Sequence, residues 1–349
     1  MGQAGLAGIS WTSGWLRSAK NHDNNFLSQN PKVEAEIVKC VGLLDEIDIK
    51  LCELLLINSR LSYDELAGKL GLSINAVHKR VKNLLDLRII RAFVARPSLI
   101  ALGAITVWIY GRCESKQLHD THLRLSRNDC TYWVGYSGGD FLYAGGYLRD
   151  MSDLDSYATI VIDETKMKDP TIGIMPTLPK RNETQKLDHL DYEIISSLHR
   201  DSRKSLADVS SELHLTARTI RNRLDKMIER QTIDLTIDWY PDASNDIFSV
   251  LHLGLTTGEG KMAFSSQLLE DFSPNLLFPI FFVNIPNQLT YFVWTNTMKQ
   301  LEDLRSRIAL TKGIESVTLN VLQIGYSFDT WRDKFPLGEK VNFPKSSMQ

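Results

Sequence analysis

Two stretches of this 349-residue chain join basic and amide side chains to an apolar stripe at helical spacing. In the stretch that begins at Thr216, Ile220, Leu224 and Met227 recur every three or four residues, which places them on one face of a helix. The opposite face would then carry groups that hydrogen-bond to base edges and charges that hold phosphates. Its polar residues are Arg218, Thr219, Arg221, Asn222, Arg223, Asp225 and Lys226.

An earlier stretch, which begins at Ser73, has the same frame. Val77, Val81 and Leu84 form its apolar stripe. A solvated helical face is the usual explanation for such charges, so the pattern alone leaves that alternative open. Its polar residues are Asn75, His78, Lys79, Arg80 and Lys82.

Composition limits how these helices could bind nucleic acid. The chain has 40 Lys and Arg against 42 Asp and Glu, a formal net charge of -2, so affinity for DNA must come from a local basic surface. No apolar run has the length of a membrane span or the form of a signal peptide, and we expect a cytoplasmic protein without a membrane partner.

Residues that could support catalysis or metal binding follow no recognisable pattern. The cysteines form no CxxC pair, and no His pair lies beside them at ligand spacing. We therefore expect reduced thiols, no metal site, no cofactor and no catalytic residue. The four cysteines are Cys40, Cys52, Cys113 and Cys130.

The chain contains an internal repeat that supplies a frame for both helices. The segment Leu44-Asp45-Glu46-Ile47-Asp48 aligns with Leu187-Asp188-His189-Leu190-Asp191, and the match continues without a gap. Apolar positions are kept while surface positions change. The matched positions are Leu66, Leu70, Leu72, Val77, Val81 and Leu84 with Val209, Leu213, Leu215, Ile220, Leu224 and Met227.

Each copy begins with three short helical patterns. Asp45 and Asp188 can cap the first helix. Ser62 and Ser205 can cap the second, and Glu65 completes a capping box in the first copy. Only Gly71-Leu72 and His214-Leu215 separate the second helix from the third, which predicts the tight turn of a helix-turn-helix. The β-rich stretches Ile89–Phe93 and Ile233–Ile237 follow as expected wing strands.

A second pattern in each copy has the order strand, helix, strand, strand, helix, strand, which predicts a ferredoxin-like βαββαβ domain. In the first copy the expected strands are Ile105–Tyr110, Tyr132–Tyr136, Phe141–Tyr147 and Ile172–Met175, with helices near Ser115–Leu125 and Met151–Ile162. In the second they are Phe248–Leu255, Phe278–Val283, Tyr291–Thr295 and Val317–Ile324, with helices near Lys261–Leu269 and Met298–Leu310.

The opening Leu-Asp-x-x-Asp, the segment Glu65–Ser73 and Arg80-Val81 resemble the Lrp/AsnC family of transcription regulators. The resemblance covers residues 44 to about 325 as two consecutive family units. It implies an α+β fold in which two winged helix-turn-helix domains alternate with two ferredoxin-like effector (RAM) domains. It also implies that double-stranded DNA is a partner, and that an amino acid or similar small effector modulates the protein.

The resemblance also implies an assembly. Family members with one unit per chain dimerise through their effector domains, so the fused pair is expected to form an intramolecular pseudo-dimer, with further homo-oligomers open. The expected parts are a flexible N-terminal extension (1–43), helix-turn-helix domains at 44–95 and 187–240, effector domains at 100–176 and 246–326, a linker (177–186) and a C-terminal tail (327–349).

Two departures from the family pattern affect the site. The family has Gly where the third helix ends, and Arg88 and Gln231 stand there, so positive φ would cost energy or the turn would change. The effector-domain hairpin often carries Gly-x-x-Asp. Here Gly138, Gly139 and Asp140 are the nearest match, and the second copy has Asn284–Gln288 instead.

Two other functions remain open at this stage. Sirohaem decarboxylases resemble the family in fold and would need a His or Arg cluster, to which the effector halves contribute His119, His122 and His252. Alternatively, one of the two helix-turn-helix units, here called heads, has lost DNA binding and serves protein interaction. The first head is the candidate, because its third helix begins with Ile74 and Ala76 where the second has Ala217 and Thr219.

Aromatic residues on the predicted effector strands have two interpretations. They could line a small-molecule pocket between domains, or form the core and the domain interface, which is the more common role of such residues. They are Trp108, Tyr110, Trp133, Tyr136, Phe281, Phe282, Tyr291 and Trp294.

Overall fold

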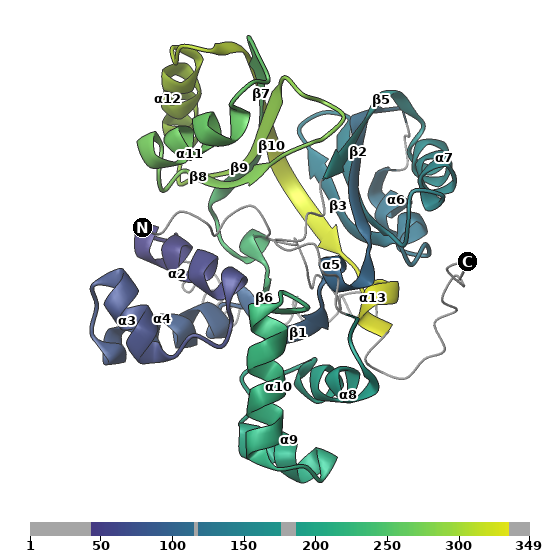
Figure 1. Cartoon of the computed structure of the whole chain (residues 1–349). Helices are drawn as coiled ribbons and strands as arrows, with labels where there is room; N and C mark the ends of the chain where they lie inside the picture. The colour runs from purple at the N-terminus through teal and green to yellow at the C-terminus, as the bar shows by residue number, and fades with distance from the viewer. Residues whose placement is uncertain (1–42, 115–117, 176–185, 335–349) are drawn as a thin grey trace, which may run out of the picture.

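The computed structural model describes residues 43–114, 118–175 and 186–334 (Figure 1). The N-terminal extension, Cys40, most of the predicted linker and residues 335–349 lie outside this range, as does the His119 side chain. Within it, the α+β class and the alternation of helix-turn-helix and ferredoxin-like parts are confirmed.

Both predicted helix-turn-helix units form. The first contains α2 (Glu46–Ile57), α3 (Tyr63–Leu70) and α4 (Ile74–Asp86); the second contains α8 (His189–Leu198), α9 (Leu206–Leu213) and α10 (Ala217–Glu229). Asp45 and Asp188 each accept a hydrogen bond from the third backbone N–H of the helix that follows, in full capping boxes. The turn residues Gly71 and His214 have φ of 66° and 53°, so the predicted left-handed turn is confirmed in both copies.

The strands expected to form wings do not pair within their own helix-turn-helix unit. β1 (Ile90–Pro97) and β6 (Ile233–Trp239) pair with each other, antiparallel, as a two-stranded ribbon built from both halves of the chain. Register pairs such as Phe93 with Ile237 and Val94 with Thr236 relate the two copies by approximate twofold symmetry. The ribbon therefore joins the two heads, a pairing that no local pattern could indicate.

The first ferredoxin-like domain, called an effector domain after its counterpart in the family that the sequence resembles, has the predicted order. It contains β2 (Ile105–Cys113), α6 (Leu118–Leu125), β3 (Thr131–Ser137), β4 (Phe141–Leu148), α7 (Asp153–Thr165) and β5 (Met167–Met175). Strand β5 begins five residues before the predicted start, because Lys166 and Asp169 take positive φ and allow Met167 and Lys168 to pair with β2.

The second effector domain repeats this order. It contains β7 (Ile247–Leu255), α11 (Lys261–Asp271), β8 (Leu276–Ile280), β9 (Gln288–Thr295), α12 (Met298–Ala309) and β10 (Ile314–Ser327). Strand β8 ends before the predicted Val283, whereas β10 is longer than predicted because it serves two domains. Its first half pairs with β7 and its second half pairs with β3.

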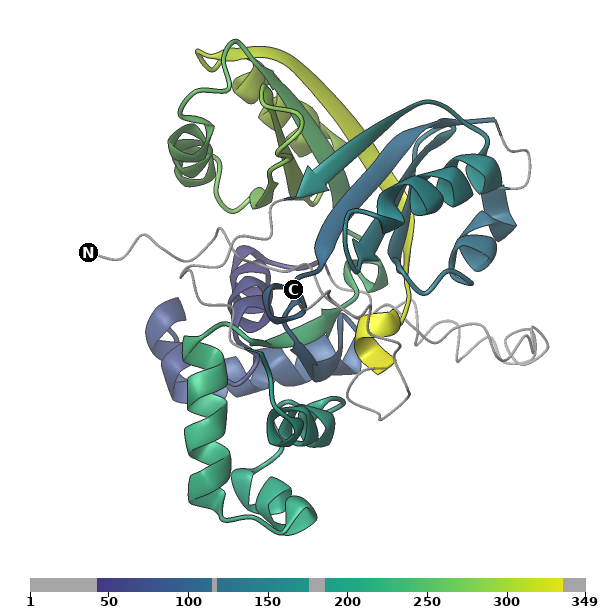
Figure 2. The same ribbon diagram turned by 45° about the vertical axis from the view of Figure 1, so that its right-hand side comes forward.

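A single eight-stranded sheet, in the order β5-β2-β4-β3-β10-β7-β9-β8, results from this sharing (Figure 2). The long strand β10 crosses from one effector domain to the other in both views. At the opposite edge the two domains meet again, where Val283 N–H donates to the Ile174 carbonyl (2.8 Å). The Asn284 side-chain amide bonds to Ile174 N (2.9 Å) and to the Ile172 carbonyl (2.7 Å), as a neighbouring strand would.

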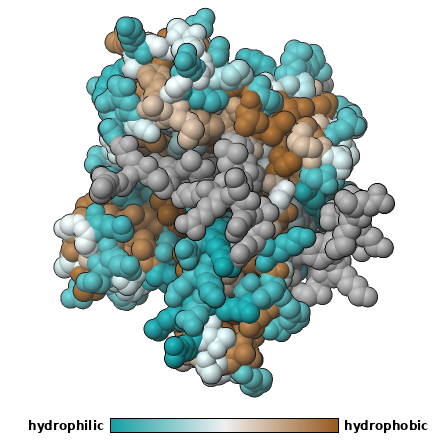
Figure 3. Space-filling model, viewed as in Figure 1, coloured by the Kyte–Doolittle hydropathy of each residue, from teal (hydrophilic) through white to brown (hydrophobic). Residues whose placement is uncertain are grey.

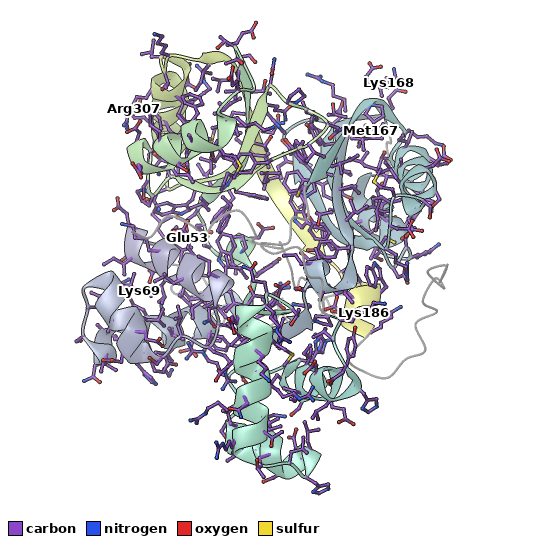
Figure 4. The ribbon with its side chains drawn as sticks, in the orientation of Figure 1. Glu53, Lys69, Met167, Lys168, Lys186 and Arg307 are labelled. Carbon is purple, nitrogen blue, oxygen red and sulfur yellow. The ribbon has the colours of Figure 1, made fainter. Side chains whose placement is uncertain are left out.

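The first head shares its hydrophobic core with the second effector domain. Leu51, Leu55 and other buried residues of α2–α4 belong to one cluster with Trp239 and Phe278, among others. Figure 4 shows Glu53 on the side of α2 toward that domain, and burial raises the pKa of Glu53 to about 7 against the effect of Lys50. The core of the second head instead consists of its own helices and the ribbon.

The helix ends at Arg88 and Gln231 adopt positive φ, 58° and 56°, so the turn keeps its geometry without glycine. A left-handed conformation costs a residue with a Cβ atom about 1–2 kcal/mol. We expect Arg88→Gly to raise the free energy of unfolding by about 1 kcal/mol in urea denaturation, after the entropic cost of glycine is subtracted. Arg88→Ala is the matched control, and an equal gain from alanine would contradict the explanation.

Candidate nucleic-acid interface

The third helix of each head presents a polar outer face over a buried stripe. In α4 the inward residues Val77, Val81 and Leu84 have no exposed surface, and in α10 Ile220, Leu224 and Met227 are buried. Ser73 and Thr216 cap these helices by accepting from the backbone N–H three residues later. Hydrophilic residues cover α10 in the view of Figure 3.

Most of the predicted contact residues are exposed on these faces. They are Ser73, Asn75, His78, Lys79 and Lys82 in the first head, and Thr216, Arg218, Arg221, Asn222 and Lys226 in the second. In the first head, Lys82 pairs with Asp86 (2.7 Å), and the His78 ring packs edge-on against Tyr63. Arg218 and Arg221 enter no ion pair within the described residues. The second head thus exposes these two guanidinium groups without an acidic partner among the described residues.

Arg80 and Arg223, both predicted to contact DNA, form ion pairs with acidic residues of their own helix-turn-helix unit. The Arg80 guanidinium pairs with Asp45 and Asp48, at 2.8 Å each, and Arg223 pairs with Asp188 and Asp191 in the equivalent way. Hydrogen bonds from Arg223 lower the pKa of Asp188.

These four carboxylates belong to the capping boxes of α2 and α8. Each arginine therefore ties the third helix to the first turn of the first helix. We assign both a positioning role within the head, because their charge is already neutralised by two carboxylates.

We expect Arg223→Ala to lower the free energy of unfolding by about 1 kcal/mol, since two carboxylates lose their partly exposed partner. Arg221→Ala is the matched control on the same helix, and its exposed side chain predicts a change within about 0.5 kcal/mol. Urea denaturation at pH 7 measures both. Equal stabilities of the two variants would contradict the positioning role.

The two heads are held at a fixed mutual position by a second symmetric contact. The buried hydroxyls of Ser59 and Ser202 lie 2.5 Å apart. Arg60 donates across to the carbonyls of Ser202 and Lys204, while Arg203 donates back to those of Ser59 (2.7 Å) and Leu61. Burial lowers the pKa of both arginines, but these carbonyl oxygens satisfy their N–H groups. Together with the ribbon, this contact fixes the spacing of α4 and α10.

The candidate effector residues lie at the hairpin between β3 and β4. Gly138, Gly139 and Asp140 are exposed, and Gly139 has φ of 78°, which suits glycine. Gly138 N–H donates to the Val321 carbonyl (3.1 Å), so the hairpin contacts the second effector domain through β10. Ligand binding at these three residues stays a prediction.

The aromatic residues between the effector domains pack mainly against one another. Trp108 stacks on Trp133 with centroids 5.3 Å apart and contacts Phe282. Gly173 leaves room for Phe282, because a Cβ there would come within 2.3 Å of its ring. The core interpretation therefore accounts for these residues.

A partly buried polar cluster centred on His252 joins the two effector domains, and the sequence analysis did not identify it as a unit. Asn320 Nδ2 donates to the Tyr143 hydroxyl (2.6 Å), which leaves that hydroxyl to donate to His252 Nε2 (2.8 Å). His252 Nδ1 lies 3.1 Å from Thr290 Oγ1, and Tyr110 stacks on the ring. Both ring nitrogens are thus engaged by protein groups.

Burial lowers the pKa of His252 to about 4. Because the unfolded state binds the proton more tightly, this histidine contributes stability above its ordinary pKa of about 6.5 and loses it as pH falls through 4. We expect the free energy of unfolding to drop by up to about 3 kcal/mol over that window. His252→Gln should flatten the pH profile in urea denaturation, and an unchanged profile would contradict this origin.

The described residues contain no candidate for a metal site or a membrane-spanning helix. Among residues 43–114, 118–175 and 186–334, no group of three or more His, Cys, Asp or Glu could hold a metal ion. In that same part of the chain, no helix has the length and apolarity needed to cross a membrane. His122 stacks on Tyr326 at 3.7 Å, and its position on α6 is separate from the His252 cluster.

Comparison with known proteins identifies the heads. The model of the AsnC-type helix-turn-helix domain matches residues 44–85 and again 187–228. Uncharacterised HTH-type transcriptional regulators of Pyrococcus furiosus and Pyrococcus horikoshii are each 30% identical to this chain over 95 residues. Those matches cover 26% of this chain and 64% of each relative.

A solved structure resembles nearly the whole chain. The sirohaem decarboxylase NirDL aligns over 84% of this chain and 96% of its own, with a TM-score of 0.57 and 12% sequence identity. At this identity the likeness shows a shared fold. It extends to the arrangement of both halves.

Proposed function

We propose that this chain, a tandem Lrp/AsnC-type protein with an AsnC-type helix-turn-helix domain in each half, is a sequence-specific DNA-binding transcription regulator. The observation that carries the proposal is the pair of capped third helices, which the ribbon and the Ser59–Ser202 contact hold in twofold relation. Such pairs address successive major grooves about one helical turn apart, or a multiple of it.

The proposal treats one chain as a two-headed unit. The symmetric register of β1 and β6 and the sharing of β10 supply, within one polypeptide, the contacts that a dimer of single-unit chains would make between subunits. The outer faces of α4 and α10 differ at nearly every position, so the DNA site should have unlike halves. A strict palindrome is not expected.

Selection of bound sequences from random duplex DNA, at two salt concentrations, tests this function. We expect one asymmetric motif with two half-sites, and affinity that falls with salt as phosphate contacts are screened. Weak binding without a motif, lost entirely at the higher salt, would contradict sequence-specific regulation.

The two heads can be tested separately on the selected duplex. Replacing both Arg218 and Arg221 by alanine should lower affinity at least tenfold, because each arginine can hold a guanine edge or a phosphate. Replacing both Lys79 and Lys82 tests the first head in the same gel-shift titration. Arg305→Ala on α12, whose side chain pairs with Glu302, is the control that should keep full affinity. Full affinity without Lys79 and Lys82 would support a first head devoted to protein interaction.

Modulation by a small metabolite forms part of the proposal. The exposed hairpin at Gly138, Gly139 and Asp140 is its candidate site in the first effector domain. Titration of amino acids against the protein, followed by thermal unfolding, would detect such a ligand through the rise in unfolding temperature. Asp140→Ala should remove the rise.

A second candidate function is decarboxylation of a tetrapyrrole, which the fold shared with NirDL favours. The His252 cluster opposes it, because hydrogen bonds within the protein occupy both ring nitrogens and leave neither for proton transfer to a ligand. Addition of sirohaem followed by absorption spectroscopy separates the two. A spectral change and loss of carboxylate groups would favour the enzyme.

A further inference from the structure

The chain continues beyond β10 into a segment that crosses between two domains. Residues Phe328–Lys334, ending in α13 (Trp331–Lys334), lie between the first effector domain and the ribbon in both ribbon views (Figures 1 and 2). Phe328, Thr330, Trp331, Arg332 and Asp333 are all buried. We call this segment the latch.

On one side the latch is attached to the first effector domain by backbone bonds. Phe328 N–H donates to the Tyr132 carbonyl and Trp331 N–H to the Asp129 carbonyl, both at 2.9 Å. The Trp331 indole N–H donates to the Tyr147 carbonyl (2.8 Å). This side is an extension of the β3–β4 region.

On the other side the latch is attached to the second head and the ribbon by charges. Arg332, with no exposed surface, donates from Nε to the Pro97 carbonyl (2.6 Å) and pairs with Asp234 on β6. Asp333 pairs with Arg96 on β1, where the two side chains are 7% and 2% exposed.

At the outer edge of this junction, Arg200, which follows α8, pairs with Asp329 (3.1 Å). Burial alone would raise the pKa of Asp333, but Arg96 lowers it to about 2, so this pair stays charged at neutral pH.

The first head is attached in a different manner. It packs on the second effector domain through the apolar cluster that contains Trp239, Phe248, Phe278 and Trp294. Apolar contacts of this kind are non-directional and tolerate small shifts. Buried ion pairs are directional, and the loss of one partner leaves an uncompensated charge that the site cannot hold. Removal of one charged side chain should therefore loosen the junction at the latch but not the apolar junction of the first head.

We infer that residues Phe328–Lys334 form an ionic latch that couples the second head to the first effector domain, and that loss of its ion pairs loosens α8 and the adjoining end of the ribbon while the first head stays docked. Opening requires both Arg332 and Asp333 to leave their partners on the ribbon. When the latch is open, the second head is therefore more mobile than the first. A change in the first effector domain would then reach the second head through the latch.

Hydrogen–deuterium exchange of the full chain, measured without DNA, tests the latch. In Arg332→Met, which keeps an apolar stem but removes the charge, we expect exchange at least tenfold faster in α8 and at the Ile233–Leu235 end of β6, with α2 unchanged. Asp333→Asn, a near-isosteric change at the second ion pair, should give the same pattern. Arg305→Met, at the exposed pair on α12, should change neither head.

The other outcomes overturn the inference. Equal acceleration in α2 and α8 would show general destabilisation, and unchanged exchange in α8 and β6 would show that other contacts hold the second head. Because no DNA is present, either result leaves the proposed function untouched. Conversely, if the unaltered chain selected no DNA sequence, the proposed function would fail but the inference about the latch would not be affected.

Discussion

The structure depends on the symmetric contact between its two halves. Strands β1 and β6 pair across the approximate twofold axis, and Ser59 meets Ser202 close to it. Arg60 and Arg203 each cross this axis to donate to backbone carbonyls of the other half. These contacts join two small helix-turn-helix units into one pair of heads. They set the spacing between the outer faces of α4 and α10.

The fusion of two units relaxes the symmetry elsewhere. Strand β10 pairs with β3 along its second half, whereas the opposite edge is closed by the Val283–Ile174 backbone bond and the Asn284 amide. One head is docked by apolar packing and the other by buried ion pairs. A symmetric dimer of identical chains makes each junction twice, whereas this chain can make two different ones. Because the two halves of one chain can differ in sequence, the outer faces of α4 and α10 can also differ, as they do here.

Local patterns predicted the elements well. The caps at Asp45 and Asp188 and the turn at His214 depend on neighbouring residues, and all three were predicted correctly from sequence. The internal repeat doubled this information, because each copy supports the other. The positive φ at Arg88 was one of two alternatives that its position suggested.

Contacts between distant segments could not be predicted in the same way. The wing strands showed β propensity but carried no sign of their partner, so the cross-copy ribbon was missed. Arg80 was predicted to contact DNA because a helical projection shows only which way a side chain faces, and that contact stays a prediction. Asp45 and Asp48, which neutralise it, lie more than thirty positions earlier in the chain. His252 was noted only with His119 and His122 as a histidine that a sirohaem site could use, and its observed partners come from strands of both domains.

The central claim is that one chain is a complete two-headed reader of DNA. Native mass spectrometry of the protein with a duplex that carries both selected half-sites tests it most directly. The account predicts one chain per duplex, with the hydroxyl-radical footprint covering both half-sites. Two chains per duplex, each protecting one half-site through the same head, would contradict the account.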